Sequence, residues 1–132
     1  MNIVERIKKI PGLYTVGKVS QEEIEKAEKN LNIKFPEEYR EFLKEFGAVS
    51  FYGTEICGLK VPEYLNVVDT TLEERELNRE FPDNVFIVER MNIDNIIAFS
   101  DESGQIFIAD DKKIKKIADS FMEYIEICAK RK

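Results

Sequence analysis

The residue types that most often perform chemistry at neutral pH are largely missing from this sequence of 132 residues. It contains no histidine, which removes the usual general base and the commonest ligand of transition metals. Ser-His-Asp and Cys-His catalysis are therefore excluded, and so are zinc sites built from cysteine and histidine. The two cysteines, Cys57 and Cys128, lie far apart and do not form a C-x-x-C motif. We expect them to be reduced, buried and inert, the alternatives being a redox sensor or a disulfide.

Carboxylates are the remaining group that could bind or react. Residues 61–111 carry a net charge of −10, whereas residues 1–60 are neutral and residues 112–132 carry +4. A field of this sign repels nucleic acid and anionic lipid and attracts a basic protein. A small hydrolase that uses two carboxylates is still possible, but no spacing selects a catalytic pair, so we assign no catalytic residue.

Two groups of acidic residues each have two explanations. The first group is an acidic run within and just after an expected helix: Glu73, Glu74, Glu76, Glu80 and Asp83. It is either a solvated helix face or a docking surface for a basic partner. The second group stands at expected hairpin ends: Asp101, Glu102, Asp110 and Asp111. These carboxylates either form turns or bind calcium or magnesium; the D-E-S-G spacing is not that of an EF-hand, so we predict turns, no metal and no other cofactor.

The helices that must position these groups follow from apolar spacing and capping residues. A short helix is expected in residues 2–10, and Ser20 with Glu23 forms a capping box for a second one. The third starts at Pro36 and ends at Gly47, which we expect to be a left-handed cap. An acidic helix is predicted to begin near Asp69 or Thr70 and to end before Pro82, and Asp119 or Ser120 caps a terminal helix. The third helix has an aromatic face, which we interpret as core: Tyr39, Phe42, Leu43 and Phe46.

Strands are expected in separate blocks from the helices. Composition becomes β-rich after Gly47, and strand-like runs occupy residues 84–90, 95–101 and 105–110. A hairpin turn with Gly104 joins the last two, and "KIKKIA" extends the sheet with Ile114 and Ile117 pointing inward. Helices and antiparallel strands in separate blocks indicate an α+β fold, and the length fits a single domain over residues 1–132.

The order of these features resembles the SUKH superfamily, which includes many bacterial toxin-immunity proteins and relatives of the fungal cell-wall-synthesis regulators. The resemblance rests on residues at the two ends of the chain: Ile24, Glu28, Leu31, Ile33, Pro36, Tyr39, Phe42, Leu43, Gly47, Gly53, Gly58, Ser120 and Phe121. It implies a central, mostly antiparallel sheet flanked by helices. It also implies binding to a cognate toxin rather than catalysis. Many members carry a tryptophan in the core or cleft, and this chain has none.

The resemblance and the charge together predict a cytoplasmic immunity protein whose partner is a basic protein toxin, with a nuclease as the class that fits best. No apolar segment approaches the ~18 residues of a membrane span, and the N-terminus lacks the apolar core of a secretory signal. From charge and loop position we predict ten partner-binding residues: Tyr52, Glu55, Glu63, Tyr64, Asp69, Glu73, Glu74, Glu76, Asp101 and Glu102. The alternative is a regulatory interaction module that binds a host signalling or cell-wall-synthesis protein.

Overall fold

Five α-helices and two antiparallel sheets are present in the computed structural model, which describes residues 2–91, 95–110 and 113–131. The helices are α1 (Ile3–Lys8), α2 (Gln21–Leu31), α3 (Glu37–Phe46), α4 (Val67–Leu77) and α5 (Phe121–Ala129), with a 3₁₀ turn η1 (Glu63–Leu65) before α4. The strands are β1 (Tyr14–Thr15), β2 (Val49–Phe51), β3 (Thr54–Ile56), β4 (Val85–Arg90), β5 (Ile97–Asp101), β6 (Ile106–Ala109) and β7 (Ile114–Ala118). This is the predicted α+β fold.

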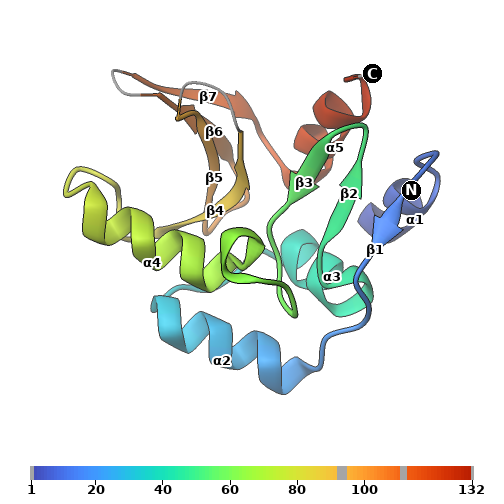
Figure 1. Cartoon of the computed structure of the whole chain (residues 1–132), viewed down its shortest axis with the longest axis horizontal. Helices are drawn as coiled ribbons and strands as arrows, with labels where there is room; N and C mark the ends of the chain where they lie inside the picture. The colour runs from blue at the N-terminus through green and yellow to red at the C-terminus, as the bar shows by residue number, and fades with distance from the viewer. Residues whose placement is uncertain (1, 92–94, 111–112, 132) are drawn as a thin grey trace.

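The strands are divided between two sheets, with the orders β1-β2-β3 and β4-β5-β6-β7. The two sheets meet just after β3, where the backbone N–H of Cys57 donates to the carbonyl of Val88 at 2.8 Å. Figure 1 shows α4 lying between α2 and the four-stranded sheet, and α1 and α5 together on the side of the small sheet. The acidic helix α4 therefore lies along one side of the larger sheet.

The aromatic face of α3 forms the centre of the core, as predicted. Tyr39, Phe42, Leu43 and Phe46 are all buried. The ring of Phe121, at the start of α5, lies 5.4 Å from the ring of Tyr39 and 5.2 Å from that of Phe42. Two segments that carry the family resemblance, about 80 residues apart in the sequence, thus pack against each other.

Gly47 and Gly58, two glycines that carry the family resemblance, lie where two segments of the backbone come close together. Gly47 has the positive φ (+73°) that was expected of a left-handed cap, but its ψ of −64° lies outside the left-handed helical region, so the prediction is right only in the sign of φ. Its carbonyl accepts a hydrogen bond from Leu59 N at 3.0 Å. A Cβ added to Gly58 would lie only 1.7 Å from the same carbonyl oxygen, so no side chain fits there. This contact holds the end of α3 against the segment that leads into η1.

Three details of the sequence prediction are wrong. The acidic helix was expected to continue until Pro82, but α4 ends at Leu77, because Asn78 leaves the helical conformation and its side chain accepts from Glu80 N at 3.1 Å in a turn. The helix α4 begins at Val67 rather than near Asp69 or Thr70, because the Asn66 side chain caps it by accepting from Val68 N at 2.9 Å and from Asp69 N at 3.2 Å. Ile114 does not point into the core: it is 57% exposed, since β7 is an edge strand whose first residues project beyond the packed part of the sheet.

A buried carboxylate, Glu89, fixes α5 to the larger sheet. It is 4% exposed, on β4 next to a bulge. Arg131 Nη1 donates to its two oxygens at 2.9 and 3.1 Å, and the Tyr124 hydroxyl also donates to it. Burial is the main cause that raises the pKa of Tyr124 above its ordinary value, so this phenol stays a donor. The charge of Glu89 is thus paired rather than left alone in the core.

Candidate binding surface

Six of the ten predicted partner-binding residues lie on one continuous segment, η1 and α4. Five of them are carboxylates, and we call this set the acidic ridge: Glu63, Asp69, Glu73, Glu74 and Glu76. Glu74 is half-buried and the other four are exposed. Tyr64, beside Glu63, is 61% exposed. The five carboxylates and Tyr64 are therefore close along the chain, but they do not share one face of α4, because Glu74 and Glu76 lie on opposite sides of the helix.

The inner face of α4 is held firmly against the sheet, which leaves its acidic face outward. Val67, Thr70 and Thr71 are buried, and the Thr71 hydroxyl accepts from Ile87 N of β4 at 2.9 Å. At the end of the helix, Arg75 Nη2 donates to the Asp83 carbonyl at 2.9 Å, and burial lowers the pKa of this guanidinium. The ridge thus stands on a rigid element, which favours a preorganised interface.

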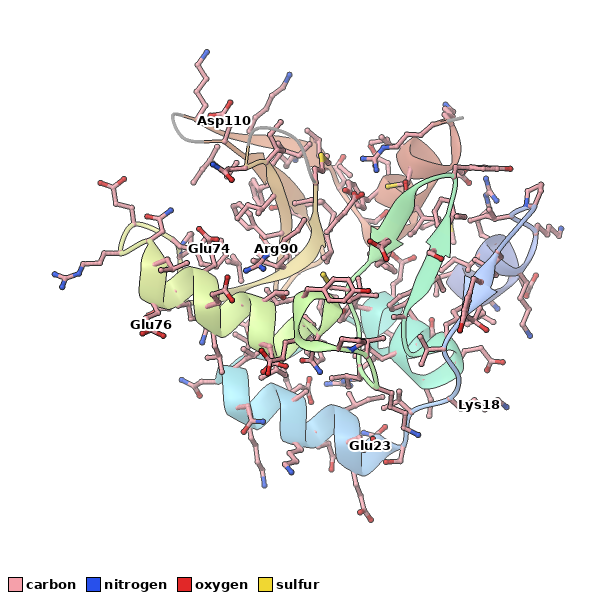
Figure 2. All side chains as sticks on the ribbon, viewed as in Figure 1. Lys18, Glu23, Glu74, Glu76, Arg90 and Asp110 are labelled. Atoms are coloured by element: carbon pink, nitrogen blue, oxygen red, sulfur yellow. The ribbon has the colours of Figure 1, made fainter. Side chains whose placement is uncertain are left out.

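A cleft of about 950 Å³ opens between the C-terminal half of α4 and the end of the four-stranded sheet. We call it the α4–sheet cleft. Apolar side chains line much of it: Leu77, Phe81, Met91, Ile96, Ile97, Ala109 and Ile114. Its carboxylates are Glu73, Glu74, Glu80 and Asp110. Figure 2 shows Glu74, Arg90 and Asp110 around the cleft, whereas Glu76 lies on the opposite side of α4.

Arg90 and Lys113 are the cations among the described lining residues of this cleft. Arg90 Nη2 lies 3.1 Å from Glu73 Oε1 and also donates to the Thr70 carbonyl at 3.4 Å. It therefore neutralises one carboxylate locally and anchors β4 to α4. Since four carboxylates face two cations, the described lining of the cleft is negative overall.

The other four predicted residues lie elsewhere. Tyr52 and Glu55 belong to the β2–β3 hairpin, whose turn points away from α4 (Figure 1). Tyr52 is half-buried with φ +49°, and Glu55 is exposed. Both are separate from the acidic ridge, so a partner that contacts α4 through the cleft would leave this hairpin free.

Asp101 and Glu102 form the β5–β6 turn, at the opposite end of the sheet from the cleft. Asp101 Oδ1 accepts from Ser103 N at 3.1 Å, from Ser103 Oγ at 2.8 Å and from Gln105 N at 2.9 Å. Glu102 Oε2 accepts from Lys34 N at 2.8 Å. These hydrogen bonds confirm turn formation, in which Gly104 has φ +96°.

No cluster of three metal-ligating side chains occurs in the part of the chain that the structure describes. Asp111, the fourth member of the acidic group at the hairpin ends, lies outside the described residues. Cys57 and Cys128 are both buried and form no disulfide. Burial is the largest of the effects that raise the pKa of each thiol to about 12. Thiols of this kind are protonated at neutral pH and are poor nucleophiles and ligands.

The apolar residues of the cleft are the part of the site that the sequence did not reveal. Leu77 is 75% exposed at the end of α4, and Ile114 is exposed at the start of β7. The sequence signal for Leu77 is its place after the charged run of residues 73–76, directly before Asn78. For Ile114 the strand pattern predicted a buried side chain, which is wrong. Side chains of an edge strand need not alternate between buried and exposed positions as those of a central strand do.

Comparison with known families supports the resemblance. A family model named SUKH_6, with the description SMI1-KNR4 cell-wall, matches residues 21–125. The match spans most of the chain and includes the Pro36–Gly47 segment and the start of α5. No curated protein matches the chain. Among the helices of the described residues, none has the length and apolar character of a membrane span.

Proposed function

Because the chain belongs to the SMI1-KNR4 family of the SUKH superfamily, we propose that it is an immunity protein that binds and neutralises a basic bacterial toxin. Domains of this family generally take part in protein interactions and are non-catalytic. The proposal makes this chain a binding protein without enzymatic activity, and places it in the cytoplasm, where its two thiols stay reduced.

The observation that carries the proposal is the acidic ridge on η1 and α4. Nuclease surfaces are basic because they grip phosphates, and carboxylates presented around one helix can imitate those phosphates and occupy the groove. Tyr64 supplies an exposed aromatic ring of the kind that anchors protein interfaces. Tyr52, Glu55, Asp101 and Glu102 complete the proposed contact set only if the toxin extends beyond α4.

The test uses the toxin encoded by a neighbouring gene. We expect the double substitution Glu74→Lys/Glu76→Lys to slow association with the toxin by at least tenfold and to flatten the salt dependence of the on-rate. Glu73 is left unchanged because it pairs with Arg90, and its reversal would also disturb β4. Stopped-flow association rates at low and high salt, together with rescue of cells that express the toxin, are the measurements.

The matched control is Glu22→Lys/Glu25→Lys on α2, which changes the net charge equally on an exposed helix. It should change the on-rate by less than threefold. Equal effects from the two double variants would mean that only net charge matters, and a toxin that never binds the wild-type protein would refute the immunity role.

The description of the matching family model, SMI1-KNR4 cell-wall, favours a second candidate: a regulatory module that binds a cell-wall-synthesis or signalling protein. The two candidates differ in what deletion of the gene does. Loss of an immunity protein kills or inhibits cells only when the toxin is present, whereas loss of a regulator changes the cell wall without any toxin.

A further inference from the structure

The α4–sheet cleft has a chemical character that the acidic ridge lacks, because large apolar side chains are open to solvent inside it. Leu77 from α4 is 75% exposed and Ile114 from β7 is 57% exposed, and both line the cleft. Phe81 and Ile97, each less than a tenth exposed, lie in the same lining. Exposed apolar surface rimmed by polar residues is typical of an interaction site.

The charges of the cleft restrict what can occupy it. Glu74, Glu80 and Asp110 line it together with Glu73, whereas the cations are Arg90, already paired with Glu73, and Lys113. An acidic or neutral apolar segment would have to desolvate Glu74 and Glu80 without offering them a positive charge. A segment that carries lysine or arginine beside its apolar residues would pair with them instead.

The size of the cleft restricts the occupant further. A volume of about 950 Å³ is at the upper end of pockets that hold small ligands, roughly 300–1,000 Å³. It accommodates a few residues of a loop or a strand end rather than the flat face of a domain. The cleft is also built on two rigid elements, α4 and the sheet, which are joined by the hydrogen bond from Ile87 N to Thr71 Oγ1.

We propose that the α4–sheet cleft binds a short protruding segment of the basic partner, in which one or two aliphatic side chains are flanked by lysine or arginine. The aliphatic side chains cover Leu77 and Ile114, and the flanking cations reach Glu74 and Glu80. The proposal rests on the proposed function for the basic character of the partner. It divides the roles between apolar contacts, which set the off-rate, and the ridge carboxylates, which set the on-rate.

The first experiment uses synthetic hexapeptides. KRLLRK is the probe, with KRGGRK and EDLLDE as controls, and binding is followed by NMR titration of the ¹⁵N-labelled protein. We expect KRLLRK to shift the amide resonances of Leu77 and Ile114 and to bind at least tenfold more tightly than either control peptide. The absence of saturable shifts in these residues would overturn the proposal.

Variants test whether the cleft itself is the site. Leu77→Ser/Ile114→Thr should weaken KRLLRK binding at least tenfold, whereas Leu72→Ser should have little effect, because Leu72 is also exposed on α4 but does not line the cleft. Glu74→Lys should weaken it more than Glu76→Lys, which lies on the other side of the helix. Equal losses within either comparison would overturn the assignment to the cleft.

Toxin binding to the same variants distinguishes the cleft proposal from the proposed immunity function. If the toxin dissociates at least tenfold faster from Leu77→Ser/Ile114→Thr, both proposals are supported. If the toxin binds and its off-rate is unchanged, the cleft proposal is overturned while the immunity role stands. If no toxin binds but KRLLRK still occupies the cleft, the immunity role fails and the preference of the cleft for a basic apolar segment is upheld.

Discussion

The guanidinium of Arg131 lies 2.9 Å from the carboxylate of Glu89, a residue 42 positions earlier that is almost completely buried. Arg131 Nη1 also donates to the Thr54 hydroxyl at 3.1 Å, so this one side chain joins the segment after α5 to both sheets. Because Arg131 is only partly buried, solvent weakens the pair, whereas the buried carboxylate of Glu89 is poorly solvated and depends on its partners within the protein.

We therefore predict that Arg131→Met lowers the free energy of unfolding by about 2 kcal/mol, because it leaves the charge of Glu89 uncompensated. The double variant Glu89→Met/Arg131→Met should lose less than the sum of the two single variants, since it removes both charges. Urea denaturation of all four proteins measures the coupling. Additive losses would show that the two side chains act independently.

The contact between Gly47 and Gly58 gives a second prediction. Gly58→Ala should lower the free energy of unfolding by about 3 kcal/mol or more, because its Cβ would overlap the Gly47 carbonyl oxygen at 1.7 Å and only a backbone shift relieves this. Gly53→Ala is the control: its Cβ would meet nothing within 4 Å, and its φ of +76° costs only about 1 kcal/mol. Similar denaturation midpoints for the two variants would contradict the overlap.

Because Cys57 and Cys128 are buried, we predict that the free energy of unfolding falls at alkaline pH. Burial raises the pKa of Cys57 and of Cys128 from 9.0 to about 12, so the unfolded chain releases these protons at a lower pH than the folded chain. The stability that depends on the thiols is complete below pH 9 and declines as the pH rises from 9 towards 12. Each thiol contributes a slope of about 1.4 kcal/mol per pH unit.

Urea denaturation between pH 8 and 10.5 measures this decline. Cys57→Ala/Cys128→Ala should show a shallower slope, although Tyr39 and Tyr124, whose pKa values burial also raises, add to the loss above about pH 10 in both proteins. Parallel curves for the two proteins would mean that the thiols do not titrate on unfolding.

The last prediction concerns metals. We expect the melting temperature to change by less than about 1 °C when EDTA is added, because the chain has no histidine and its carboxylates at the β5–β6 turn already accept hydrogen bonds from the backbone. Calcium added after dialysis serves as the reverse test. A drop of many degrees with EDTA would reveal a structural metal ion.

Much of the fold was predictable because its signals are local. The capping box of Ser20 and Glu23 is present, and the apolar face of α3 is buried as its spacing indicated. The start of α4 was missed because Asp69 and Thr70 are also good capping residues, and nothing in the sequence ranks Asn66 above them. The capping residue is determined by how α4 packs against β4, since this packing requires Thr70 and Thr71 to be buried within the helix.

The candidate site was predictable in part for the same reason. Charge counting located the acidic ridge, since Glu73, Glu74 and Glu76 are close in sequence. The cleft was not predictable, because Leu77 and Ile114 meet only through the tertiary fold. Glu89 was also missed: next to Arg90, it resembles the polar end of a strand, and only the bulge and α5 enclose it. Glu28 shows the reverse case, a residue of the family resemblance that proves structural, since it accepts from Phe35 N at 2.8 Å and from Arg40 at 3.1 Å.

The packing of Phe121 between α3 and the rest of the core has a consequence for synthesis of the protein. During translation, Tyr39 and Phe42 leave the ribosome long before Phe121, and their rings have no α5 to pack against until then. The ion pair between Arg6 and Glu126, at 2.7 Å, likewise joins the first helix to the last. The aromatic core around α3 is therefore complete only after α5 has been synthesised, so the last step in folding this core has to wait for Phe121.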